Sequence, residues 1–148
     1  MSIAYCDTEV RPRCSVDVVF VLDESGSIGT TTFNFAKSFL SRLVGYLDID
    51  SGNMRVGLVT YSTNVEDDFY LNTHSSVAGI RSAIASLAYR GGNTNTADAV
   101  ARVRTRMLTS ARGGRNNVPN IVVLLYDGQS TSSTTNTLVS HQLYARVL

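Results

Sequence analysis

The stretch "VVFVLDESGSIG", residues 18–29, changes character within a few positions. Its first half continues a β-branched and apolar run from Val16 to Leu22, the pattern of a strand buried on both faces of a parallel sheet. Asp23 ends this run, and Ser25 and Ser27 follow it with a glycine between them. The sequence therefore places one carboxylate and two hydroxyls directly after a buried strand.

The rest of the chain alternates between expected helices and strands. A helix is predicted from Thr31 or Thr32 to the acidic segment 48–53, because apolar residues recur there at helical spacing. The apolar face of this helix consists of Ala36, Phe39, Leu40, Leu43, Val44 and Leu47. Further helices are expected over 75–88, with Ser75 or Ser76 as N-cap, and over 96–109 and 135–147; strands are expected over 54–62, 65–71 and 121–126. The short link at 63–64 predicts an antiparallel hairpin, with the acidic strand at the edge. This order predicts an α/β fold, a doubly wound and mostly parallel sheet with one antiparallel edge strand and helices on both faces.

Length and composition fit one globular domain: 148 residues, 43% hydrophobic, with a formal net charge of +1. This charge gives no reason to expect nucleic acid as a partner, and no apolar run approaches the roughly 18 residues of a membrane span. The N-terminus lacks the pattern of a signal peptide. Cys6 and Cys14 could form a small disulfide loop or stay as free thiols.

Three loops are expected at the carboxyl ends of the strands, where such sheets bind ligands. They are the loop after Asp23, the segment 91–96 (GGNTNT) before a helix, and the Asp127-Gly128 turn after the strand over 121–126. Each is ordinary by itself, because Asp-Gly is a common turn and Asn-Thr a common helix cap. Together they offer two carboxylates and several hydroxyls, with no histidine or cysteine nearby in the sequence. All-oxygen ligands select Mg²⁺, Mn²⁺ or Ca²⁺ over zinc or copper.

At this point the chain resembles the von Willebrand factor type A family. The segments "VVFVLDESGSIG", "GLVTYS", "YRGGNTNTADAV" and "NIVVLLYDGQS" are similar to successive family motifs over about residues 16 to 133. Carried over by position, the resemblance implies a metal-ion-dependent adhesion site formed by Asp23, Ser25, Ser27, Thr94 and Asp127, with Mg²⁺ as the expected ion and Mn²⁺ or Ca²⁺ as alternatives. Tyr126 departs from the family pattern, which usually has threonine there.

The amino-acid sequence of these motifs is similar to that of the extracellular matrix branch of the family, as in matrilins and collagens. The resemblance therefore implies a secreted, non-enzymatic adhesion module that binds an Asp or Glu side chain of a matrix or cell-surface protein. It also implies residues 1–15 as an extension and 16–148 as a domain that lacks its last strands. The strand over 121–126 would then have an open edge, through which copies of the chain could associate.

The residues also bear on three other functions: phosphoryl transfer, serine hydrolysis and glycosaminoglycan binding. Asp23 could accept a phosphoryl group, but such sites need an acid/base partner and a cationic clamp, and no lysine follows Lys37. Neither His74 nor His141 accompanies the Gly-x-Ser-x-Gly motif of a serine hydrolase, so both are expected to be surface or packing residues. Five arginines could bind a glycosaminoglycan without metal, although a solvated helix surface is the simpler interpretation; they are Arg102, Arg104, Arg106, Arg112 and Arg115.

Overall fold

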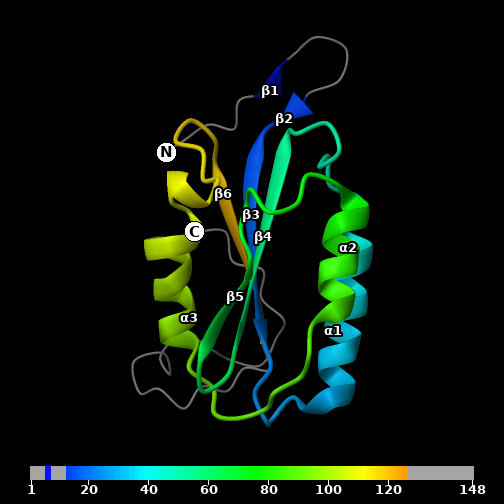
Figure 1. Cartoon of the computed structure of the whole chain (residues 1–148), viewed down its shortest axis with the longest axis vertical. Helices are drawn as coiled ribbons and strands as arrows, with labels where there is room; N and C mark the ends of the chain where they lie inside the picture. The colour runs from blue at the N-terminus through cyan, green and yellow to red at the C-terminus, as the bar shows by residue number, and fades with distance from the viewer. Residues whose placement is uncertain (1–5, 8–12, 127–148) are drawn as a thin grey trace.

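The computed structural model describes residues 6–7 and 13–126, and its main feature is a four-stranded sheet with the order β5-β4-β3-β6 (Figure 1). The strands are β3 (Val16–Asp23), β4 (Met54–Tyr61), β5 (Val65–Phe69) and β6 (Asn120–Leu125). β3 runs parallel to β4 and to β6, and β5 joins β4 antiparallel at the edge. The expected doubly wound, mostly parallel sheet is therefore confirmed, and its antiparallel strand lies at the edge as predicted.

Helices cover both faces of this sheet (Figure 1). α1 (Gly29–Val44) and α2 (Val77–Ser86) lie side by side on one face, and α3 (Thr96–Arg102) lies on the other. Ser76 is the N-cap of α2, as predicted, and its hydroxyl accepts a hydrogen bond from the Gly79 amide. Every residue of β3 is buried, because this strand has a neighbour on each edge and helices on each face.

Two helix predictions need correction. α1 ends at Val44 rather than near Leu47, and Phe39 is 51% exposed although the periodicity placed it on the buried face. Leu40 and Val44 are buried as predicted, and Phe33 adds to the same core face of α1. α3 ends at Arg102, after which the chain forms a π-helical turn, η1 (Val103–Met107), and then a 3₁₀ turn, η2 (Ser110–Arg112). The wider turn buries Val103 and Met107 together against the sheet.

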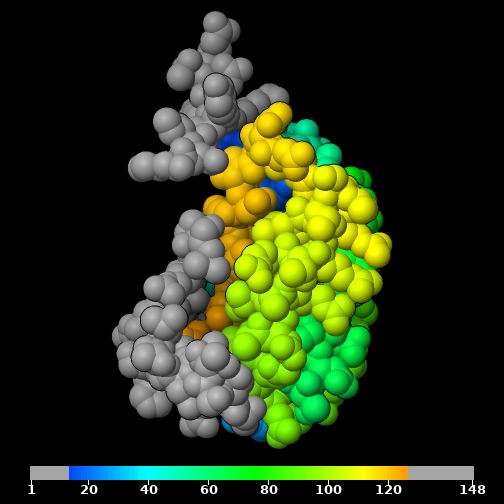
Figure 2. Space-filling model, turned by 90° about the vertical axis from the view of Figure 1, so that its left-hand side faces the viewer, coloured from blue at the N-terminus to red at the C-terminus, as the bar shows by residue number. Residues whose placement is uncertain are grey.

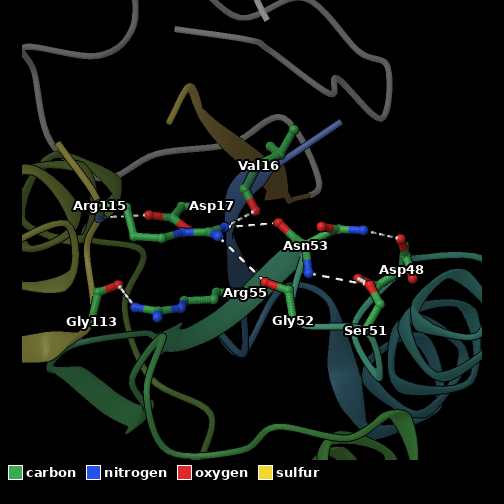
Figure 3. Close-up of polar contacts among 9 residues, drawn as sticks. All are labelled: Val16, Asp17, Asp48, Ser51, Gly52, Asn53, Arg55, Gly113 and Arg115. Atoms are coloured by element: carbon green, nitrogen blue, oxygen red, sulfur yellow. Dashed lines mark hydrogen bonds and ion pairs between the residues drawn. The ribbon is translucent and has the colours of Figure 1, made fainter. Parts of the chain in front are cut away.

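The amino end of β3 is held by a buried ion pair (Figure 3). Asp17 is fully buried, and Arg115 donates to it from its backbone amide at 2.7 Å and from Nε at 2.8 Å. The same guanidinium reaches the carbonyl oxygens of Val16, at 3.1 Å, and Asn53, at 2.9 Å. Arg115 therefore fastens the loop before β6 to the starts of β3 and β4.

A separate two-stranded sheet lies within the expected N-terminal extension. Its strands are β1 (Cys6–Asp7) and β2 (Arg13–Cys14), and Cys6 is the register partner of Cys14. Cys14 is disulfide-bonded, and Cys6 is the chain's only other cysteine, so the structure favours the disulfide over the free thiols. The domain boundary at residue 15 remains a prediction.

Two further expectations concern regions at the limit of the described chain. The helix expected over 135–147 lies outside the described residues. Within residues 13–126, β6 pairs with β3 alone, and association of copies through its other edge remains a prediction. No helix in the described ranges has the length and apolar composition needed to cross a bilayer.

The Asp17–Arg115 pair provides the first testable prediction. Arg115→Met keeps the aliphatic stem but leaves a fully buried carboxylate without its cation, so we expect the free energy of unfolding to fall by about 3–5 kcal/mol. Urea denaturation monitored by circular dichroism measures this change. The matched control is Arg104→Met, because Arg104 is exposed, and it should change stability by less than about 0.5 kcal/mol. Similar small losses in both variants would contradict the assigned role of the pair.

Candidate metal centre

The carboxyl end of β3 brings together three of the predicted ligands. Asp23, the last residue of the strand, is fully buried, and its Oδ1 accepts a hydrogen bond of 2.7 Å from the Ser25 amide. This short turn fixes the carboxylate relative to the loop that follows. The hydroxyl oxygens of Ser25 and Ser27 lie 3.0 Å apart. Ser25 is fully buried whereas Ser27 is exposed, so the group of oxygens extends from the interior to the surface.

The loop that carries Thr94 is attached directly to the loop after β3. The Gly26 amide donates to the Gly92 carbonyl at 2.8 Å, and the Asn95 amide donates to the Ser62 carbonyl at 3.0 Å. Gly92 has a φ of 114°, and a Cβ there would meet the Thr63 hydroxyl, so this position requires glycine. Thr94 is buried between these anchors, at 5% exposure. Both loops lie at the lower end of the sheet in Figure 1.

Two further contacts brace the site, and sequence reasoning assigned a role to neither. The Tyr89 hydroxyl donates to the Ser25 carbonyl at 3.0 Å, which ties the segment after α2 to the serine loop. Glu24 lies between Asp23 and Ser25 and its side chain is 1% exposed. It accepts from the Arg90 amide at 3.1 Å and pairs with the Arg90 guanidinium at 3.0 Å. Glu24 follows the apolar run and Asp23 in the sequence, and only the structure shows that its side chain is buried and therefore needs a cation from elsewhere in the chain.

The structure therefore brings four of the five predicted ligands to one edge of the sheet: Asp23, Ser25, Ser27 and Thr94. Asp127 lies outside the described residues, directly after the described part of the chain at Tyr126. These four residues offer one carboxylate and three hydroxyls, which are oxygen ligands that suit a hard divalent cation. Within the described residues no cluster of three His, Cys, Asp or Glu side chains occurs, so hydroxyls would have to supply much of the coordination.

The five arginines considered for glycosaminoglycan binding are mostly engaged within the protein. Arg102 and Arg106 pair with Asp67, at 3.5 Å and 2.7 Å, and Arg115 pairs with Asp17. Arg112 stacks over the Tyr70 ring, with 4.2 Å between its Cζ and the ring centroid. Arg104 is exposed, and it is the one member of the five for which the structure gives neither an ion pair nor a ring contact. His74 packs edge-on against Phe69, which agrees with a packing role; His141 is outside the described residues.

Comparison with known proteins agrees with this geometry. The sequence profile described as von Willebrand factor type A domain matches residues 17–146. The chain belongs to the von Willebrand factor type A family. The solved structure of proximal thread matrix protein 1 from the mussel byssus superposes with a TM-score of 0.75 at 26% identity, covering 88% of this chain and 34% of the other. A second structure of that protein, with a TM-score of 0.74, has zinc in its metal-ion-dependent adhesion site (MIDAS) motif.

The curated relatives include extracellular matrix proteins. Vitrin of Mus musculus is 36% identical over 120 residues, which cover 81% of this chain and 18% of vitrin. Collagen alpha-4(VI) chain of Mus musculus is 40% identical over 126 residues, which cover 81% of this chain and 6% of the collagen. Cochlin of Bos taurus is 35% identical over 115 residues, which cover 78% and 21% respectively. The chain thus spans at most about a fifth of each of these relatives.

Asp68, on β5, provides a pH prediction beside this site. Burial raises the pKa of Asp68 from its ordinary value of 3.8 to about 6, against the lowering effect of hydrogen bonds from Thr60 and of the Arg90 charge. Between these two values the folded chain holds a proton that the unfolded chain has released. The contribution of this group is therefore favourable below about pH 4 and is lost as the pH rises to about 6.

The variant Asp68→Asn should remove this dependence, since an amide does not ionise but can still accept the Thr60 hydrogen bond. We expect the unfolding free energy at pH 7 to rise by up to about 3 kcal/mol relative to the wild type, with the difference vanishing near pH 4. Chemical denaturation at several pH values between 4 and 7 measures it. Glu66→Gln, at an exposed position of the same strand, is the control. An unchanged pH profile in Asp68→Asn would contradict the assignment.

Proposed function

We propose that this domain is a non-enzymatic adhesion module that binds an acidic side chain of a matrix or cell-surface protein through a divalent cation. Its support is the group of oxygens at the end of β3, where the buried Asp23 is followed by the 3.0 Å pair of serine hydroxyls. Asp23, Ser25, Ser27 and Thr94 would hold the ion, together with Asp127. Mg²⁺ fits short oxygen ligands on rigid strand ends, and Mn²⁺ or Ca²⁺ are the alternatives.

The physical basis of this function is the small charge of the ligand set. Hydroxyls are neutral, so two carboxylates at most would offset the ion's charge. When bound, the ion supplies an electrophilic position at which a partner's carboxylate can replace water. Ser27 is the exposed member of the set, so this position would face the surface on its side. The Tyr89 and Arg90 contacts hold the loops in place before a partner arrives, which lowers the entropic cost of binding.

Specificity would come from the surface around the ion, because a single carboxylate does not distinguish partners and stable interfaces bury roughly 1,200–2,000 Å². The exposed Asn93 and the neighbouring Asn95 border the site, and we expect residues 129–134, which lie outside the described range, to contribute as well. A pocket of ≈ 400 Å³ lies next to them, between the hairpin turn at Thr63 and α3, lined by Asp98 and Arg102 among others. Figure 2 shows this face, with the green hairpin beside the lime and yellow α3 surface. This pocket is large enough to accommodate a second side chain of the partner, next to the partner's carboxylate.

An enzymatic role has less support. Phosphoryl transfer to Asp23 would need a cationic clamp and an acid/base group beside it. Arg90, the cation braced at this end of the sheet, is engaged by Glu24 through two hydrogen bonds, and this engagement raises the Arg90 pKa further above its usual range. The matrix relatives agree with a binding function rather than catalysis.

Metal binding is the first test of this function. Calorimetric titration of the chain with Mn²⁺ and with Mg²⁺ should show one bound ion. Asp127→Ala and Ser27→Ala should each weaken binding by about tenfold or more, because each removes a ligand. Ser82→Ala serves as the control, since Ser82 is an exposed serine within α2 and is not one of the proposed ligands. A cooperatively folded chain that binds no ion would overturn the proposal.

The second test concerns the partner's carboxylate. The Mn²⁺-loaded chain is incubated with an array of peptides in which each peptide with a central glutamate has a glutamine counterpart. We expect a subset of glutamate peptides to bind, their glutamine counterparts to bind at least about tenfold more weakly, and chelator to abolish the difference. Binding that ignores both the chelator and the glutamine substitution would rule out carboxylate recognition through the ion.

A further inference from the structure

A groove of ≈ 550 Å³ runs between α1 and α2, on the face of the sheet opposite α3. Figure 1 shows these two helices side by side, away from the arginine-rich segment that follows α3. Three cationic side chains line this groove: Lys37 and Arg42 from α1, and Arg81 from α2. Hydroxyls of Ser38 and Ser41 lie among them.

No acidic residue is among the described residues that line this groove. Neither α1 nor α2 contains an Asp or Glu, although the chain has 12 acidic residues in all. Within the described part of the chain, Lys37, Arg42 and Arg81 form no ion pair, in contrast to Arg90, Arg102, Arg106 and Arg115. The groove therefore concentrates three positive charges on a protein whose formal net charge is only +1.

Two of the three cations are held in place by the helix ends. The Lys37 ammonium donates to the carbonyl oxygens of Ala85, at 2.9 Å, and Leu87, at 2.7 Å. Arg81 donates from Nε to the Ser41 carbonyl at 2.9 Å, and its guanidinium lies against Gly45, where a Cβ would collide with it. Carbonyl oxygens are neutral, so these bonds orient the cations without cancelling their charge. An ammonium has three donors and a guanidinium five, which leaves donors for a ligand.

From this geometry we propose that the α1–α2 groove binds a sulfated polysaccharide chain independently of the metal centre. Lys37 and Arg42 are five positions apart on α1, about 8 Å along the helix axis. Arg81 faces them from α2. A linear polyanion can contact all three sites at once, whereas a single sulfate or phosphate group cannot. The hydroxyls that line the groove suit the polar surface of a sugar chain.

The lining also distinguishes a polysaccharide from nucleic acid. Single-stranded nucleic acid is usually bound through aromatic side chains on which the bases stack. No aromatic residue is among the described residues that line the groove, so it offers charge and hydroxyls without a stacking surface. The relatives in the extracellular matrix agree with a sulfated ligand.

The test uses a heparin hexasaccharide and the whole 148-residue chain. We expect binding that weakens as salt rises, because sulfate contacts release counterions, and that is unchanged by chelator. The double variant Arg42→Ala/Arg81→Ala should bind about tenfold more weakly or worse. Arg104→Ala is the matched control, since it removes one exposed charge from the opposite face; it should lower affinity by less than about twofold. Arg42→Ala alone removes an exposed side chain and should show part of the loss without a change in thermal stability.

Lys37 gives an independent readout because it is the chain's only lysine. The hexasaccharide should slow acetylation of Lys37 by an amine-reactive reagent, while acetylation of the N-terminal amine is unaffected. Protection of Lys37 together with selective loss of affinity in the groove variants supports the proposal. It is overturned if no binding occurs, if Arg104→Ala weakens binding as much as Arg42→Ala, if chelator abolishes binding, or if a DNA oligonucleotide binds equally well at the same salt concentration.

Discussion

The burial of β3 constrains the rest of the structure. All eight residues of this strand are buried, yet the strand has a carboxylate near each end, Asp17 as its second residue and Asp23 as its last. A charge in such surroundings is stable only with hydrogen bonds and compensating charge. At the amino end the chain supplies both from Arg115, which draws the loop before β6 onto the sheet. At the carboxyl end the Ser25 amide donates to Asp23, and the hydroxyls of Ser25 and Ser27 lie in the same loop.

The loop at the carboxyl end of β3 is held in place by side chains that are not themselves proposed metal ligands. Glu24 points away from the oxygen cluster toward Arg90, and Tyr89 holds the Ser25 carbonyl, so each residue after β3 has a separate fastening. Gly26 and Gly92 allow the two loops to meet backbone to backbone. A binding site formed by short side chains needs this support, because serine and threonine hydroxyls have little reach with which to correct a displaced loop.

The sequence was sufficient for the order of elements and for the position of four candidate residues at one end of the sheet, because these depend on local patterns: β-branched runs, a capping serine and polar residues at strand ends. It was insufficient for Phe39, since a periodic apolar residue on a helix is buried only if a neighbouring element covers it. The π-helical turn after Arg102 was also missed, because it follows from how Val103 and Met107 pack on the sheet. The partners of Arg102, Arg106 and Arg115 lie 35 or more residues away in the chain, and no local pattern identifies such pairs.

The distribution of these pairs explains why the net charge of the chain says little about its partners. Asp67 and Asp17 engage arginines on the α3 side of the sheet, where the sequence shows its densest cluster of basic residues. On the other side, α1 and α2 carry three cations, Lys37, Arg42 and Arg81, and neither helix contains an acidic residue to engage them. A dense cluster of basic residues can therefore have its positive charge offset by paired carboxylates, while a sparse cluster without such carboxylates keeps its positive potential. The uncompensated charge of a surface is set by which carboxylates the fold brings beside each cation, and this makes the α1–α2 face more suited to an anionic ligand than the arginine-rich segment.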